Sequence, residues 1–185
     1  MINISMEKEA KNGEFEICEK LEGGVVVSFL NVKTAKESRA FNKDIGEYFI
    51  LDFKKDELFN KKTQNSLVGS AHKCINKLLA SLNVDLTKKG ALVVGLGNEQ
   101  IIADAFGAFV AKKILVTRPF VLNDKNKSMI PVSAITPDIY LKTGIETFDM
   151  ISGVCKSIDP ALVVLVDSYG TKKLERVGGS LQLSS

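Results

Sequence analysis

The stretch VVGLGNEQIIADAFG, from Val93 to Gly107, decides the fold of this chain. An apolar run leads into a tight Gly-Leu-Gly-Asn turn, and a lone carboxylate, Asp104, follows inside an otherwise apolar segment. A short apolar run that ends in a turn is typical of a buried strand, and the segment after the turn has helical spacing. The stretch therefore predicts a strand, a turn and a helix. It also raises the question of whether the turn holds a nucleotide or places an acid.

The glycines of this turn do not form a nucleotide-binding motif. A dinucleotide fingerprint needs G-x-G-x-x-G, but Gln100 stands where the third glycine belongs, and Glu99 would repel a pyrophosphate. A Walker loop fails as well, because no Gly-Lys-Ser/Thr follows. The structural alternative is that Gly95 and Gly97 permit a sharp turn between a strand and a helix.

Helical and apolar segments alternate on both sides of this stretch. Such alternation predicts βαβ units and an α/β fold, with three α/β/α layers around a mainly parallel or mixed sheet. From Gly24 to Phe53 the pattern is instead that of two strands joined by a polar connection over 33–45, which predicts an N-terminal antiparallel pair. We expect helices over about 63–82 and 102–112 and from Thr143, strands over 91–96, 113–118 and 161–167, a loop over 123–128 and a short apolar piece over 129–135.

Length and composition favour one globular domain, with two lobes as the open alternative. The 185 residues are 45% hydrophobic, which is enough for a sizeable core, and we expect a single α/β domain with a strand-rich part over 1–60 and an α/β core over 61–185. There is no apolar run of about 18 residues and no secretory signal, so a cytoplasmic protein without membrane contact is expected. The net charge of +3 is spread over interleaved lysines and acids, which disfavours direct nucleic-acid binding.

The cysteines and the histidine give no sign of a metal site or a catalytic triad. Cys18, Cys74 and Cys155 are far apart in the sequence and odd in number, so we expect reduced thiols and no metal knuckle. His72 is the one histidine, and it lies in a segment of helical periodicity where a helix residue without catalytic duty is the simpler interpretation. No cofactor and no bound metal are expected.

Two carboxylates follow apolar runs at the places where α/β folds carry their chemistry. Ligands collect beyond the carboxyl ends of the strands in such sheets. Asp104 follows the first run, and Asp167 ends the run ALVVLVD directly. If the two acids meet, they can share a proton and activate water as general base and general acid. The structural alternatives are a first-turn helix acid at Asp104 and a helix cap at Asp167 before a helix that starts near Ser168.

A second pattern predicts a helix start. Thr143 and Glu146 have the T-x-x-E spacing of a capping box, in which each side chain satisfies an exposed amide of the first turn. This structural role is the preferred interpretation of Glu146.

Five segments together resemble the germination protease (spore protease) family in order and spacing. The resemblance implies an atypical aspartic endopeptidase that degrades small acid-soluble spore proteins in the spore core or forespore, on a fold shared with hydrogenase maturation proteases. Asp104 matches the acid of the family's Asp-Ala-Leu-Gly segment, and Asp167 matches the acid that closes the family's apolar strand. On this resemblance the turn of Gly95, Gly97 and Asn98 places an acid or contacts substrate. The segments are VVGLGN (93–98), ADAFG (103–107), ILVTRPF (114–120), PVSAITPDIYLKTGIET (131–147) and VVLVDSYGTKKLERVGGSLQLS (163–184).

The sequence also departs from the family pattern. Glu99 stands where the family has Trp, Ile102-Ala103 where it has Thr-Pro, and Gly107-Ala108 where it has Gly-Pro. These departures keep open a noncatalytic or truncated relative with a binding or assembly role. A metal-dependent maturation protease would use the same acids as ligands, but no suitable histidine accompanies them.

The end of the sequence carries a further expectation. Family members continue beyond LQLSS, where this chain stops. We expect the chain to leave a sheet edge or an apolar face less protected, to associate with itself as a homo-oligomer through that surface, and to be a weaker peptidase than longer relatives.

Overall fold

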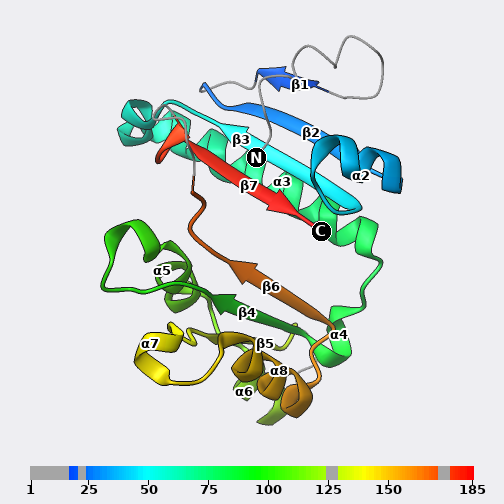
Figure 1. Cartoon of the computed structure of the whole chain (residues 1–185), viewed down its shortest axis with the longest axis vertical. Helices are drawn as coiled ribbons and strands as arrows, with labels where there is room; N and C mark the ends of the chain where they lie inside the picture. The colour runs from blue at the N-terminus through cyan, green and yellow to red at the C-terminus, as the bar shows by residue number, and fades with distance from the viewer. Residues whose placement is uncertain (1–16, 21–23, 124–128, 171–175) are drawn as a thin grey trace. The chain divides into compact units, whose positions relative to one another are not determined.

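The protein divides into two compact units, seen in a computed structural model that describes residues 17–20, 24–123, 129–170 and 176–185. The first unit combines residues up to Asn83 with those from Gly170 onward, and the second runs from Val84 to Tyr169. An antiparallel sheet lies in the first unit and a parallel sheet in the second (Figure 1). The expected α/β class is therefore confirmed, with its strands in two sheets.

The antiparallel sheet has the order β1-β2-β3-β7. β2 and β3 are the expected N-terminal pair, and they hold one continuous register, from Val26 opposite Asp52 to Val32 opposite Gly46. β7 adds to the other side of β3, although it lies far along the chain. The strands are β1 (Ile17–Lys20), β2 (Val26–Val32), β3 (Gly46–Asp52) and β7 (Ser180–Ser184).

The core of the first unit lies between this sheet and the long helix α3 (Lys61–Leu82). Because side chains alternate across a strand, Phe49 and Leu51 share one face of β3, and both pack in one buried cluster with Cys74 and Leu78 of the helix. The expected helix over 63–82 is confirmed. It begins after the 3-10 turn η2 (Lys55–Phe59), where Asn60 caps it by accepting the N–H of Lys62 at 2.9 Å.

The polar connection between β2 and β3 contains a short helix that the sequence analysis missed, α2 (Ala35–Phe41). A capping box begins it: Thr34 Oγ1 accepts the N–H of Glu37 at 3.2 Å, and Glu37 Oε2 accepts the N–H of Thr34 at 2.9 Å. The N–H of Lys33 donates to the same Glu37 oxygen. These backbone hydrogen bonds, that of Lys33 first, hold the pKa of Glu37 below its ordinary value.

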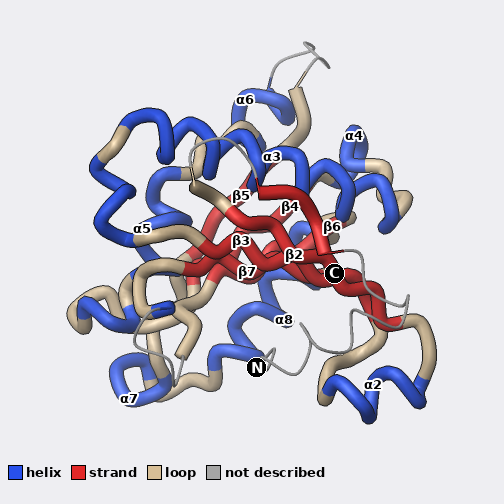
Figure 2. Tube along the Cα trace, turned by 90° about the horizontal axis from the view of Figure 1, so that it is seen from above, coloured by secondary structure: helices blue, strands red, loops and turns tan. Residues whose placement is uncertain are grey.

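The parallel sheet of the second unit has β4 at its centre. Both neighbours of β4 run parallel to it, and the helix α5 packs against all three strands. Leu92 and Val94 of the central strand are fully buried. Figure 2 shows the strands in red and the helices in blue. None of the described helices is long and apolar enough to cross a membrane. The elements are α4 (Leu86–Lys89), β4 (Ala91–Gly95), α5 (Phe106–Lys113), β5 (Val132–Ile135) and β6 (Leu162–Val166).

The strand expected over 113–118 is wrong. Lys113 ends α5, and Arg118 already begins the next helix, α6 (Arg118–Asn123). Thr117 bonds to Val132 of β5, through its own N–H and through its hydroxyl, whereas the N–H of Ile114 donates back to Ala111 O, so the segment forms no continuous ladder with β5. Pro119 fits the start of a helix because its fixed φ suits the first turn. Of the expected loop over 123–128, residues 124–128 lie outside the described residues.

The helices near the acids begin later than expected. The segment from Ile102 is a 3-10 turn, η3 (Ile102–Asp104), followed by α5. Thr143 is the last residue of α7 (Tyr140–Thr143), and Gly144 ends that helix in the left-handed region at φ 67°. α8 (Thr147–Ile158) then begins with Glu146 as its N-cap, without a side-chain capping bond. The capping box expected from Thr143 and Glu146 is therefore wrong.

The strand expected over 161–167 is present as β6, but it is not buried. Val163, Val164 and Leu165 are 37%, 39% and 58% exposed. Within the described residues β6 bonds to β4 alone, at one end of the order β5-β4-β6. A strand at the edge of a sheet keeps one side unpaired, which explains the difference.

Candidate active site

The two sequence-predicted acids follow adjacent strands of the parallel sheet. β4 and β6 pair with Gly95 opposite Val166, and the N–H of Leu96 donates to Val166 O at 2.8 Å. Asp167 is the next residue after Val166. Because parallel strands end at the same edge of a sheet, the turn after β4 and Asp167 lie at that edge.

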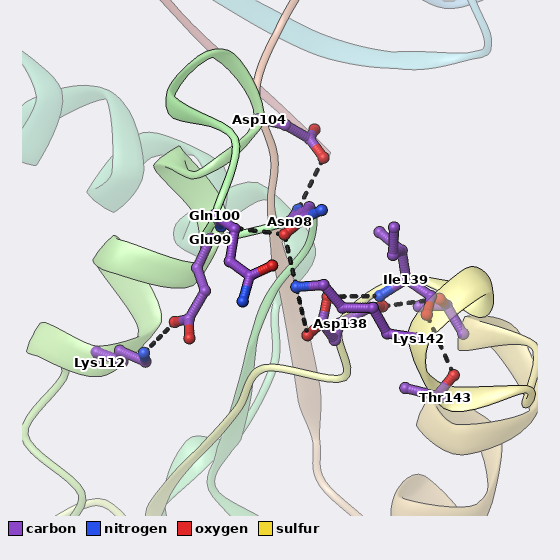
Figure 3. A network of polar contacts seen from close by, with 10 residues as sticks. Asn98, Glu99, Gln100, Asp104, Lys112, Asp138, Ile139, Lys142 and Thr143 are labelled. Atoms are coloured by element: carbon purple, nitrogen blue, oxygen red, sulfur yellow. Dashed lines mark hydrogen bonds and ion pairs between the residues drawn. The ribbon is translucent and has the colours of Figure 1, made fainter.

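Asp104 reaches back to the turn that follows β4. Its Oδ2 accepts the N–H of Asn98 at 2.7 Å (Figure 3). Its own N–H donates to Ile101 O at 2.8 Å, and the N–H of Ile101 donates to Asn98 O at 3.0 Å. The segment between Asn98 and Asp104 is therefore a closed loop that fixes the half-buried carboxylate beside the strand end.

Asp167 is more open to solvent. Its side chain is exposed, and its Oδ1 accepts the N–H of Ser168 at 2.7 Å. No helix follows over 168–170, so a cap at Asp167 for a helix starting there is excluded. Ser168 Oγ is buried and has no hydrogen-bond partner within the described part of the chain. The facing of the Asp104 and Asp167 carboxylates across one cleft stays a prediction.

Glycine is required in this turn because the backbone closes on itself. Gly97 has φ 96°, in the left-handed region, and a Cβ on it would overlap with the carbonyl oxygen of Asp104. A Cβ on Gly95 would overlap with the carbonyl oxygen of Gly107 in α5. The two glycines thus let the segment that carries Asp104 fold directly onto the end of β4.

Asn98 joins this turn to a second segment. Its side chain is buried, and Asn98 Oδ1 accepts both the N–H of Gln100 at 3.0 Å and the ammonium of Lys142 at 2.6 Å. Lys142 also donates to Asp138 Oδ2 at 3.2 Å. The sequence analysis missed Lys142 and Asp138, although both lie in one of the segments that resemble the germination proteases. No local pattern signals a contact between residues 44 positions apart.

Comparison with known proteins gives the family. Residues 3–185 match the family model described as germination protease. The chain belongs to the germination protease family. It is 32% identical to the germination protease of Clostridium tetani over 92% of this chain, and 32% identical to that of Priestia megaterium over 98%. Identity to the Bacillus cereus germination protease is 30% over the full chain.

This member of the germination protease family spans about half the length of the curated relatives it matches. The matched part is 52% of the Clostridium tetani protein, 51% of the Priestia megaterium protein and 50% of the Bacillus cereus protein. Peptidase activity, substrates and partners of the longer proteins therefore come to this chain as proposals.

The other side chains of this family member that the sequence singled out lie on helices, His72 and Cys74 on α3 and Cys155 on α8. His72 is exposed on α3, where its Nε2 lies 3.3 Å from Asn76 Nδ2. Cys74 and Cys155 form no disulfide. In the described ranges, no three His, Cys, Asp or Glu side chains gather as a set of metal ligands.

Proposed function

We propose that this chain is an endopeptidase of the germination protease type. It hydrolyses peptide bonds of small acid-soluble spore proteins during germination, in the spore core or forespore, with Asp104 and Asp167 acting on a water molecule. The observation that supports the proposal is the pairing of β4 with β6, because Asp167 follows β6 directly and the Asp104 carboxylate bonds to the turn after β4. The family membership supports a protein substrate.

The proposed reaction needs one acid in each protonation state. One carboxylate takes a proton from water while the water oxygen bonds to the carbonyl carbon of the substrate. The other carboxylic acid gives its proton to the amide nitrogen as the carbon–nitrogen bond breaks. After product release, one proton exchange between the acids and solvent restores the starting state. Gly95, Gly97 and Asn98 serve this chemistry by shaping the turn that carries Asp104.

Incubation with a purified small acid-soluble spore protein tests this function. We expect discrete fragments whose masses identify the hydrolysed bonds, and we expect EDTA to leave the rate unchanged because the proposed step uses carboxyl groups and water alone. Full loss of hydrolysis with EDTA, restored by zinc, would establish the metal-dependent alternative instead. Intact substrate in the presence of folded protein would support a noncatalytic relative with a binding role.

We also infer that two copies of the chain associate through β6. Val163, Val164 and Leu165 of this strand are exposed, and one edge of the strand is unpaired within the described residues. An edge strand can pair with the same strand of a second copy about a two-fold axis, which buries the apolar side chains of both.

Light scattering at micromolar concentration checks this inference. We expect a dimer for the native sequence and a monomer for Leu165→Lys, since Leu165 is the most exposed of the three residues and a lysine there places a charge in an apolar contact. Phe148→Lys is the matched control, because Phe148 is also exposed but lies on α8. A monomeric native protein would contradict the inference.

A further inference from the structure

Lys142 connects two segments that are distant in sequence. It lies in α7, and its ammonium donates to Asn98 Oδ1 at 2.6 Å and to Asp138 Oδ2 at 3.2 Å (Figure 3). The contact with Asp138 is an i,i+4 pair, local in the sequence. The contact with Asn98 is different, because it joins α7 to the turn after β4.

The Asn98 contact matters because Asn98 also binds the carboxylate of Asp104. Asn98 is only 6% exposed, and Asn98 Oδ1 accepts hydrogen bonds from both Gln100 and Lys142. The Asn98 main-chain N–H donates to Asp104 Oδ2. A hydrogen bond from an ammonium group is stronger than one between neutral groups. Lys142 therefore fixes the residue that in turn fixes the Asp104 carboxylate.

Asp138 holds the ammonium of Lys142 near Asn98. The two side chains are 33% and 29% exposed, so the ammonium is partly shielded from water and the carboxylate neutralises it. Asp138 has φ 64°, in the left-handed region, and its Oδ1 accepts the N–H of Ile139 at 2.9 Å. Its carbonyl oxygen accepts the hydroxyl of Thr147 at 3.3 Å, which ties the residue to the first turn of α8.

We propose that Lys142 is a positioning residue, which acts through Asn98 to hold Asp104 in its reactive position. This inference rests on the proposed function, in which Asp104 acts on water. It extends that function by giving α7 a role in fixing the turn beside Asp104. Asp138 takes part by holding the ammonium of Lys142 at the turn.

Kinetics of Lys142→Met, Lys142→Arg and Lys89→Met test the role of this lysine. Methionine keeps most of the apolar stem and removes every donor, so we expect kcat to fall between about tenfold and a hundredfold with KM unchanged, as for a misplaced catalytic group. Arginine keeps the charge and donors and should restore part of the loss. Lys89 is the matched control because its ammonium pairs with Asp159 at 2.7 Å and does not contact the Asn98 turn.

Hydrogen exchange of the Asn98 amide, measured by NMR, provides a readout that is independent of activity. We expect this amide to exchange on the order of tenfold faster in Lys142→Met and at the native rate in Lys89→Met, because only the first variant loosens the bond to Asp104. If Asp104→Asn stays active, the proposed function fails, but the exchange experiment still decides whether Lys142 fixes the turn. Native kcat together with native Asn98 exchange in Lys142→Met would overturn the inference.

A second variant covers the case in which Lys142→Met does not fold. Asp138→Asn preserves size and removes the charge that holds the ammonium. We expect the same fall in kcat at unchanged KM and the same faster exchange of the Asn98 amide, in a smaller degree. Native values for both would equally overturn the inference.

Discussion

Replacing Asp104 or Asp167 with asparagine should abolish peptide-bond hydrolysis and leave the protein folded. Each substitution removes one of the two groups that exchange protons with water and substrate, and a positioned acid or base contributes about 10²-fold to 10⁴-fold to the rate. The amide oxygen of an asparagine at 104 can still accept the N–H of Asn98. Asp167 is exposed at a strand end, so its change does not disturb the core.

The measurement is the rate of fragment formation from a small acid-soluble spore protein, compared at equal concentrations of folded protein. Asp149→Asn is the matched control, because Asp149 is an exposed acid in the first turn of α8. We expect native activity from this control. Activity in either acid variant close to that of the control would disprove the aspartate pair.

The second large effect is on stability and concerns Gly107. A Cβ on this residue would overlap with the carbonyl oxygens of Val166 and Leu96, at the place where α5 lies on the ends of β4 and β6. Backbone atoms that belong to a hydrogen-bonded strand pair cannot move aside easily. We therefore expect Gly107→Ala to lower the free energy of unfolding by about 3 kcal/mol, the upper end for overpacking.

Urea denaturation followed by circular dichroism measures this loss, with Gly153→Ala as the control. Gly153 lies within α8 and has open space around the position of a Cβ. Alanine favours a helix over glycine by about 1 kcal/mol, so the control should be more stable than the native protein. Equal midpoints for the two variants would show that the contact at Gly107 is not as close as the structure has it.

Periodicity in the sequence predicted the elements that pack most regularly. The alternating pattern gave β2 and β3, the helical spacing gave α3, and the apolar run before Gly95 gave β4. An apolar run does not reveal how many neighbours a strand has. β6 is as apolar as β4, yet it is exposed because it lies at the edge of the sheet and β4 at the centre.

The T-x-x-E pattern occurs at two places in the chain, and it forms a capping box at only one of them. Thr34 and Glu37 form a capping box at the start of a helix that the sequence analysis did not predict. Thr143 and Glu146 have the same spacing, but the left-handed Gly144 ends one helix between them, and Glu146 becomes the cap of the next. The pattern alone cannot tell a residue before a helix from the last residue within one.

For the candidate site, the expectation from the sequence rested on a general rule of α/β folds. Asp104 and Asp167 were expected at strand ends because α/β sheets carry their chemistry there. No such rule predicts Lys142, because its proposed role depends on how α7 lies against the turn after β4. Contacts of this kind follow from tertiary packing and require a structure.

The place of β7 in the antiparallel sheet has a consequence for the order of folding. The second unit is one continuous stretch of chain, whereas the first unit includes β7, which follows the second unit in the sequence. During synthesis, one edge of β3 therefore stays unpaired until the whole second unit has left the ribosome. The second unit can fold as soon as it emerges, but the first sheet closes only by a contact that is distant in sequence and correspondingly slow to form. We therefore expect one edge of β3 to be open to wrong pairing at the stage when the second unit is already compact.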